Sequence, residues 1–269
     1  MKNEPDLFSS TFDSSPDTRV LFLDTETTGP DPETAHVCEI ALVLSSYTAF
    51  SRMPEEDIVF SSLVKPPVPV PPEASAVHHI TGEMLQDEPP IEEISNNVEP
   101  LVQKADFVCA HNIPFDMTIL RRQLPSVFKN VGHEKELDSL RLSRHIWPLI
   151  PSHALQVLRY RFDLDSHVSG DAHRALFDTE LVRVLIEHIT AKNLTECSDW
   201  QELVELSQSP LEIKVFSFGK YRGKLVEDII ARDRDYIKWL LRQNWVTSDY
   251  PDLYHTLLAK TRAGKQEQS

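Results

Sequence analysis

The sequence predicts an α/β protein in which a mixed β-sheet is flanked by helices. Three runs rich in Val, Ile and Leu come first, over residues 19–26, 35–46 and 57–66, and each has the composition of a buried strand. One further short apolar run, residues 106–112, lies among segments whose Leu, Val and Ile residues recur at helical spacing. Three strands in succession, followed by helices interleaved with a fourth strand, are typical of a sheet covered by helices.

The helical segments follow from apolar spacing and from the positions of proline. We expect helices over residues 91–105, with a bend near Pro100, and over residues 114–124, 152–162 and 173–192. Pro114 stands in the first turn of its helix, where the missing N–H has no partner to lose. The Pro-rich residues 65–74 cannot donate regular ladder bonds, so they are expected to form a loop or an extended connector.

Composition divides the chain into four parts. Residues 1–18 are polar and without periodicity, which predicts a disordered tail, and residues 19–192 contain the sheet and its helices. Residues 193–210 are polar and end in a proline, which predicts a linker, although residues 200–206 would also fit one or two helical turns. Residues 211–264 predict a small basic α+β module with a short strand, a glycine-bracketed turn and one or two helices.

Length and composition disfavour several classes of protein. The 269 residues suffice for one large and one small domain, and no stretch approaches the roughly 20 apolar residues of a membrane span. The acidic, Ser-rich beginning lacks the basic start and apolar stretch of a signal peptide. Cys38, Cys109 and Cys197 form no CxxC pair, so they are expected to be core thiols of a cytoplasmic protein.

Charge is distributed unevenly along the chain. The formal net charge of −15 at pH 7 argues weakly against a nucleic-acid partner, because phosphates are bound largely by Lys and Arg. Residues 214–242, however, contain eight basic and four acidic residues. The sequence therefore predicts a basic segment on an otherwise acidic protein.

The first predicted strand ends in two carboxylates. Asp24 and Glu26 are two residues apart, so they face the same side of a strand. A buried, unpaired carboxylate is costly, and it either takes up a proton or binds a cation. No Lys or Arg stands beside these two in the sequence, so the cation must come from elsewhere.

Two more acids stand at the edges of predicted core elements. Asp116 opens a helix directly after the strand at residues 106–112, and Asp178 lies within a strongly apolar helix. Each of these acids alone would be an ordinary turn, cap or surface residue. The four carboxylates together indicate an oxygen-rich site of the kind that binds Mg²⁺ or Mn²⁺.

Three motifs contain these acids: DTETTG (24–29), HNIPFD (111–116) and HRALFD (173–178). As a set they resemble the motifs of the DEDDh 3'–5' exonucleases, which have a ribonuclease H-like fold, and the resemblance extends over residues 19–192. The stretch FGKYRGK (218–224) is similar to the C-terminal part of the exodeoxyribonuclease X group.

The resemblance implies a mechanism. Asp24, Glu26, Asp116 and Asp178 would bind two Mg²⁺ ions, with Mn²⁺ as a substitute, and the ions would activate water at the scissile phosphate of a 3' end. His173 would accept the proton of that water. Residues five apart are about 140° out of register on a helix, so His173 is expected in the loop or first turn before the helix of Asp178. The expected product is a 5'-mononucleotide.

Further residues are expected to bind the substrate. Near the site these are Thr25, Thr27, His78 and Phe115, although His78 and Phe115 would equally serve as packing residues. In the C-terminal module they are Lys220, Tyr221, Arg222 and Lys224, which would offer phosphate contacts and an aromatic ring for stacking. The alternative for this second group is a small stabilising module whose basic residues keep it soluble.

The expected partner is DNA with a 3' end, single- or double-stranded, in repair or end processing. Two other functions stay open: an RNA-trimming 3'–5' exonuclease, and a non-catalytic 3'-end-binding or replicase-associated subunit. The resemblance also allows a homodimer. Residues 4–8, EPDLF, resemble the short peptides that sliding clamps bind, although a disordered tail with one incidental apolar pair explains them as well.

Overall fold

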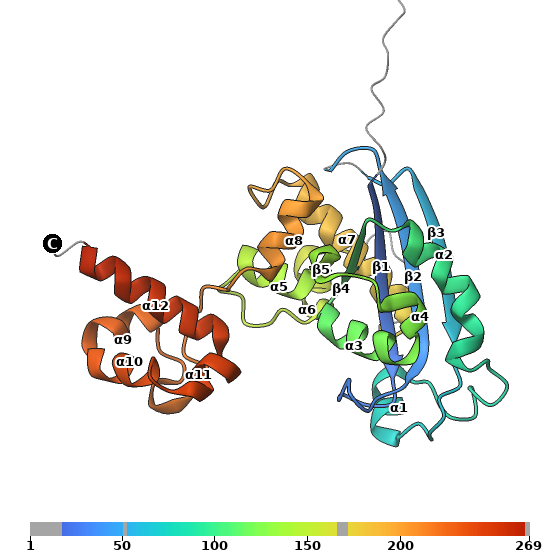
Figure 1. Ribbon diagram of the computed structural model, residues 1–269, viewed down its shortest axis with the longest axis horizontal. Coiled ribbons are helices and arrows are strands. Elements are labelled where there is room, and N and C mark those ends of the chain that lie inside the picture. Colours follow the sequence, from blue (N-terminus) through green and yellow to red (C-terminus); the bar gives the residue numbers. More distant parts are fainter. Residues whose placement is uncertain (1–17, 51–52, 166–171, 267–269) are drawn as a thin grey trace, which may run out of the picture.

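A five-stranded mixed sheet forms the core of the larger part of the protein (Figure 1). The structure is a computed structural model and describes residues 18–50, 53–165 and 172–266. The strands are β1 (Thr18–Thr27), β2 (Val37–Tyr47), β3 (Glu56–Leu63), β4 (Phe107–Ala110) and β5 (Glu136–Asp138), arranged in the order β3-β2-β1-β4-β5. The first three strands pair antiparallel, whereas β4 joins β1, and β5 joins β4, in parallel. The predicted mixed sheet is confirmed, and β5 is an addition to it.

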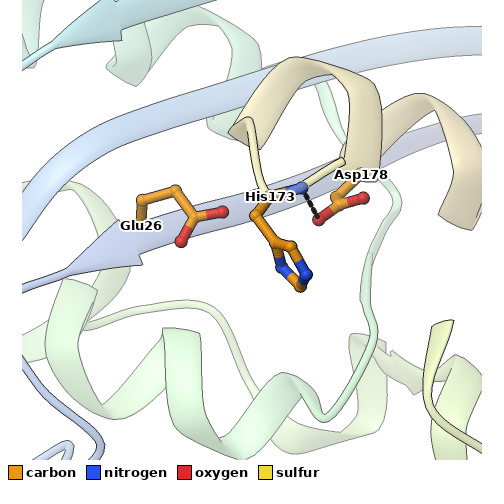
Figure 2. Close-up of side chains that lie close together, drawn as sticks. All are labelled: Glu26, His173 and Asp178. Carbon is orange, nitrogen blue, oxygen red and sulfur yellow. Dashed lines mark hydrogen bonds between the residues drawn. The ribbon is translucent and has the colours of Figure 1, made fainter. Parts of the chain in front are cut away.

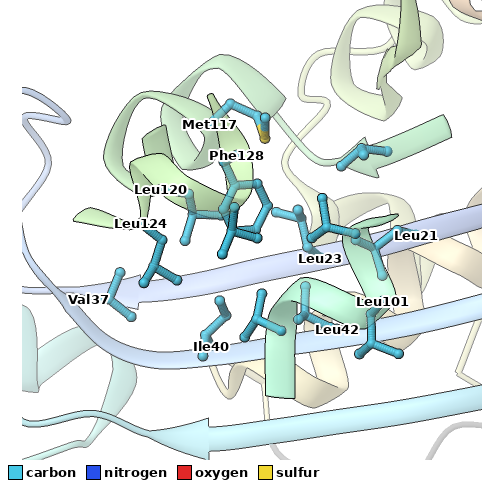
Figure 3. Packing of buried hydrophobic residues seen from close by; sticks show 14 of the residues in the cluster. Leu21, Leu23, Val37, Ile40, Leu42, Leu101, Met117, Leu120, Leu124 and Phe128 are labelled. Carbon is cyan, nitrogen blue, oxygen red and sulfur yellow. The ribbon is translucent and has the colours of Figure 1, made fainter. Parts of the chain in front are cut away.

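Alternate residues of β1 face two separate hydrophobic clusters. Leu21 and Leu23 pack with the helices α2 (Ser95–Lys104), α3 (Ile113–Gln123) and α4 (Pro125–Phe128), as Figure 3 shows. Val20 and Phe22 face α5 (Ser139–Ile146), α6 (Leu155–Phe162) and α7 (Ala175–Ala191) on the opposite side. Each fully buried apolar side chain of this size stabilises the fold by about 1.5–3 kcal/mol, so both faces of the sheet are anchored.

Two proline-containing segments differ from expectation. The short helix α1 (Pro72–His78) begins inside the Pro-rich stretch that was expected to be loop or connector, because Pro72 opens it at a position that needs no N–H donor. A 3₁₀ turn, Ile91–Ile94, leads directly into α2, and Pro100 lies within that helix without ending it.

The predicted linker over residues 193–210 contains a helix that belongs to the sheet domain. In α8 (Trp200–Gln208), Trp200, Leu203 and Val204 are buried in the same cluster as α7. The Asp199 side chain accepts a hydrogen bond from the Glu202 N–H at 2.8 Å and caps the helix. The segment reads as polar because only one face of this short helix packs, so the linker prediction needs correction.

The C-terminal residues form a helical unit with its own apolar cluster. Its helices are α9 (Val226–Arg232), α10 (Arg234–Leu240), α11 (Asn244–Asp249) and α12 (Pro251–Gln266), and Figure 1 shows them set to one side of the sheet domain. Within the described residues its β-pairing is a single bridge between Val215 and Leu225, so the expected α+β character reduces to helices. Gly219 and Gly223, at φ 67° and 79°, close the turn that was predicted to be bracketed by glycines.

Arg141 of α5 joins the two parts of the molecule. Its guanidinium donates to the carbonyls of Ser207 and Ser209, at 2.9 and 2.7 Å, and pairs with Asp252 of α12 at 3.1 Å. Asp252 also accepts a hydrogen bond from the Leu211 N–H at 2.9 Å. The chain between α8 and the C-terminal helices is therefore fixed at several points.

The described helices include none that combines the length and the apolar character needed to cross a bilayer. The three cysteines are free thiols, and Cys38 and Cys109 are buried. Burial raises the pKa of the Cys38 thiol to about 12, so this side chain packs as a neutral apolar group.

Candidate active site

Strand β1 presents Asp24 and Glu26 at its carboxyl end, on the side of the sheet that faces α7. Glu26 lies directly opposite Glu39 of β2, and the register shifts immediately after it, where the strand ends. Burial raises the pKa of Asp24 well above its usual range, and the nearby charges of Asp116 and Glu26 raise it further. Burial also raises the pKa of Glu26 to about 8, with Asp178 as the next cause.

Asp116 reaches the same edge from the other face of the sheet. Because β1 and β4 are parallel neighbours, their carboxyl ends meet, and α3 begins directly after β4. Asn112 makes the turn between them at φ 75°, and its N–H donates to the Asp138 carboxylate at 3.2 Å. The Thr25 hydroxyl donates to Asp116 Oδ1 at 2.7 Å. Burial raises the pKa of Asp116 to about 7 despite this hydrogen bond.

Asp178 lies in the first turn of α7, and His173 precedes the helix, as the spacing predicted. The His173 N–H donates to Asp178 Oδ2 at 3.2 Å, and Gln156 of α6 donates to Asp178 Oδ1. His173 has φ 61°, which is unusual for a residue with a side chain. Burial raises the pKa of Asp178 to about 6, although His173 acts in the opposite direction.

Glu26, His173 and Asp178 form a cluster whose ligand atoms all lie within 4.8 Å of one another. Figure 2 shows the imidazole of His173 projecting beside the two carboxylates. Burial raises the pKa of each of the four site carboxyls, and neighbouring carboxyls raise that of Asp24 and Glu26 further, so a bound cation would favour their ionised forms. A donor set dominated by carboxylate oxygens fits a hard divalent ion such as Mg²⁺ or Mn²⁺.

An ion pair between the buried Glu39 and the partly exposed Arg174, which the sequence reasoning missed, supports this site. Glu39 Oε1 accepts a bond from Arg174 Nη2 at 2.7 Å, and Oε2 accepts one from the Ala175 N–H at 3.0 Å. These bonds fix the first residues of α7 opposite Glu26. The signal was present in the sequence, because Glu39 stands within the apolar run VCEIALVL as Asp24 does within its own strand.

A pocket of about 570 Å³ adjoins the carboxylates and contains several of the expected substrate-binding residues. Thr25, Thr27, His78 and Phe115 line it, together with apolar groups that include Ala74 and Val77 of α1. Its volume lies in the range of about 300–1,000 Å³ that is usual for small-molecule sites. The structure therefore brings these four residues together beside the acidic cluster.

His78 does not offer a ring nitrogen to a phosphate. Its Nδ1 accepts a hydrogen bond from the Ile80 N–H at 3.0 Å, and its Nε2 donates to the Thr27 carbonyl at 3.2 Å. Burial lowers the pKa of this imidazole, in keeping with a neutral ring. The expected phosphate contact is thus replaced by a structural role, because His78 fixes the backbone of Thr27 in the pocket wall.

The four residues of the C-terminal turn that were expected to bind substrate divide into two pairs. Lys220 pairs with Asp233 at 2.9 Å, and the Tyr221 hydroxyl donates to the same carboxylate at 2.6 Å. Asp233 also caps α10 by accepting the Tyr236 N–H at 3.0 Å, so Lys220 and Tyr221 stabilise the unit. Arg222 and Lys224 are exposed, and neither has an acidic partner within 4.0 Å among the residues the structure describes.

The stretch that resembles a clamp-binding peptide, residues 4–8, lies outside the described residues.

Comparison with known proteins agrees with this geometry. A family model described as "Exonuclease" matches residues 21–184, and one described as "Exodeoxyribonuclease X-like C-terminal" matches residues 216–244. Exodeoxyribonuclease 10 of Escherichia coli (strain K12) is 32% identical over 200 residues, which cover 73% of this chain and 82% of that protein. The DNA polymerase III subunit epsilon of Treponema pallidum (strain Nichols) is 32% identical over 178 residues, covering 63% of this chain and 77% of that protein.

Solved structures show the same fold. Exonuclease X in complex with 5' overhanging duplex DNA superposes with a TM-score of 0.53 at 26% identity, covering 70% of this chain and 99% of that one. Exonuclease I, at 19% identity and a TM-score of 0.52 over 70% of this chain and 42% of that one, shares the fold. The chain belongs to the exonuclease family, in its DEDDh branch and near exodeoxyribonuclease X.

Proposed function

We propose that this protein is a metal-dependent 3'–5' exodeoxyribonuclease that removes 5'-mononucleotides from DNA 3' ends, in repair or end processing. The observation that supports it most is the meeting of Glu26, His173 and Asp178 beside a pocket at the carboxyl edge of the sheet. The relative named exodeoxyribonuclease 10 and the exonuclease X structure with DNA support DNA as the substrate.

Asp24, Glu26, Asp116 and Asp178 would bind two divalent ions, with Mg²⁺ expected and Mn²⁺ as a substitute. Such ions, when bound, supply activation of water and stabilisation of charge on the phosphate oxygens. Metal dependence is a property of the family, and the carboxylates fit it because they repel one another without a cation.

His173 is assigned the role of general base. Its backbone is held in place because its N–H donates to Asp178. Its side chain is exposed, so the imidazole is accessible to a bound substrate. A neutral imidazole at this place would take the proton from the attacking water. The turn at His173, with φ 61°, places this residue before α7 and beside Asp178 of its first turn.

The terminal nucleotide would occupy the pocket beside β1. Phe115 offers an apolar surface for a base or sugar, and the backbone of Thr25 and Thr27 offers polar contacts. His78 would act indirectly, because it holds Thr27 in position.

The C-terminal unit would hold the DNA at a distance from the site. Arg222 and Lys224 are the exposed basic residues of its glycine turn, and they would contact phosphates. The same residues would be of little use for stability, because neither is engaged in an ion pair within the described residues.

An RNA-trimming exonuclease is the second candidate, since the same carboxylates and His173 serve ribose substrates equally well. A non-catalytic end-binding or replicase-associated subunit is disfavoured by the presence of all five motif residues. A homodimer and a sliding-clamp contact stay predictions.

Digestion of matched 5'-labelled DNA and RNA oligonucleotides tests the proposal, with Mg²⁺, with EDTA, and with the Asp178→Asn variant. We expect a ladder that shortens from the 3' end of DNA, requires metal and is lost in the variant. A ladder on RNA alone would leave the site as assigned and change the substrate. Tight binding to 3' ends without cleavage of either polymer would move the protein to the end-binding class.

A further inference from the structure

A row of aromatic side chains lies on the C-terminal unit, partly at its surface. Tyr236 stacks on Trp239 with ring centroids 5.7 Å apart and an interplanar angle of 25°. Trp239 lies 6.4 Å from Trp245, and Trp245 lies 5.4 Å from Phe218. Trp239 is 48% exposed and Trp245 is 37% exposed, whereas Trp200 of α8 is 4% exposed. The two exposed indoles thus lie next to each other on one small unit.

The exposed indoles do not form the core of this unit. Helix α10 buries Ile237 and Leu240, which pack with Phe216 and Leu257. Successive helical residues are 100° apart, so the face of Trp239 differs from the face that these residues bury. The exposed half of a large apolar side chain contributes nothing to the stability of the fold. Several such side chains next to one another indicate a binding surface.

Positive charge lies at one end of the aromatic row. Lys220 Nζ is 4.7 Å from the ring centroid of Tyr236, which itself stacks on Trp239. Arg222 and Lys224 follow in the same turn and are exposed. Residues 214–242 hold eight basic and four acidic residues in a chain whose net charge is −15. Lys220 is already paired with Asp233, whereas Arg222 and Lys224 have no acidic partner within 4.0 Å among the described residues, and a polyanion would supply one to both.

We propose that Trp239 and Trp245 form a stacking platform for unpaired bases of single-stranded DNA, whose phosphates Arg222 and Lys224 contact. Aromatic rings bind bases of any sequence through their faces, and in a duplex those faces are already stacked on neighbouring bases. The proposal rests on the proposed DNA exonuclease function, because the platform would hold the strand behind the 3' end that is being removed. The proposal gives the C-terminal unit a preference for single strands, which the catalytic residues do not specify.

Binding to a labelled oligo(dT) in EDTA, where no degradation occurs, tests the platform in the full chain. Trp239→Ala and Trp245→Ala should each raise the Kd for oligo(dT) about tenfold, since one stacked base is lost. Trp239→Phe should stay within about threefold of wild type, because phenylalanine still stacks. Leu149→Ala, which also removes an exposed apolar side chain, is the matched control and should change nothing. Thermal unfolding of each variant verifies that it folds.

The outcomes separate this platform from the exonuclease function. Unchanged oligo(dT) affinity in both alanine variants would overturn the platform. An equal loss on a blunt duplex of the same length would overturn it too, because it would assign the surface to phosphate contacts alone. If the protein self-associates and Trp239→Ala abolishes this while DNA affinity is unchanged, the surface would be a contact between two copies of the chain, and the platform would be overturned. Failure of the exonuclease proposal would instead show as absent cleavage while these binding differences persist.

Discussion

The two ends of the molecule use charge in opposite ways. In the sheet domain Asp24, Glu26 and Asp116 come from two elements far apart in sequence, and burial raises the pKa of each. In the C-terminal unit Lys220 and Asp233 lie close in sequence, and their ion pair is partly exposed. Buried like charges destabilise a protein until a cation arrives, whereas exposed pairs contribute about 0–1 kcal/mol. Substitutions should therefore have large effects at the first site and graded effects at the second.

The largest effect is expected from Asp178→Asn. The substitution preserves an oxygen that can accept the His173 N–H but removes the carboxylate charge, so kcat should fall by about a thousandfold or more. Steady-state digestion of a DNA oligonucleotide in Mg²⁺ measures it, and Asp87→Asn, an exposed acid, serves as control. A loss below tenfold would remove Asp178 from the metal site.

Glu39→Gln should lower activity by about 10–100-fold, as is usual for residues that orient the ligands of a metal without contacting the metal. Glutamine loses the charge that pairs with Arg174, so the start of α7 with His173 is held less firmly. The loss should appear mainly in kcat, because the start of α7 carries His173 and Asp178. A rise in KM with kcat unchanged would contradict a positioning role.

Metal-free stability should decline as pH rises. The pKa of Glu26 is raised from about 4.5 to about 8, so the folded chain keeps a proton that the unfolded chain has released. The stabilisation is complete below pH 4.5, and it is lost as pH approaches 8, by up to about 1.4 kcal/mol per pH unit.

Urea unfolding in EDTA at pH 5.5 and 7.5 measures this slope. Glu26→Gln, which cannot ionise, should gain about 2 kcal/mol relative to wild type between these pH values, whereas Glu196→Gln, at an exposed position, should not. Mg²⁺ at pH 7.5 should stabilise wild type more than Glu26→Gln. Equal slopes for all three proteins would show that Glu26 is ionised in the fold.

The smallest effect is expected from replacing Arg222 and Lys224 together by alanine. KM for single-stranded DNA should rise roughly threefold to tenfold, and the slope of log KM against log salt should flatten by about 1.4, at 0.7 for each lost phosphate contact. Lys129→Ala, at the exposed residue that follows α4 in the sheet domain, should leave the slope unchanged. An unaltered slope in the double variant would show that the turn does not contact phosphates.

Motif and periodicity predicted the sheet and the acidic cluster because these depend on local pattern. The strands β1, β2 and β3 are long enough for their composition to be read, whereas the three residues of β5 are too few. The segment of helix α8 was left open between a linker and one or two helical turns, because its exposed face dominates its composition. The roles of His78 and Glu39 depend on partners 51 and 135 residues away, which no local pattern contains.

The contacts of Arg141 have a consequence for how DNA is held. Because the guanidinium binds both the end of α8 and Asp252 of α12, it holds the start of the last helix against the sheet domain that contains the carboxylates. A strand bound at the catalytic pocket can also bind the C-terminal unit only if it is long enough to reach both. For such a strand the second contact forms at a high effective concentration. Oligonucleotides below that length would bind through the catalytic pocket alone. The affinity for a strand would therefore depend on its length: a long strand would bind at both places, and a strand shortened by digestion would bind more weakly and dissociate.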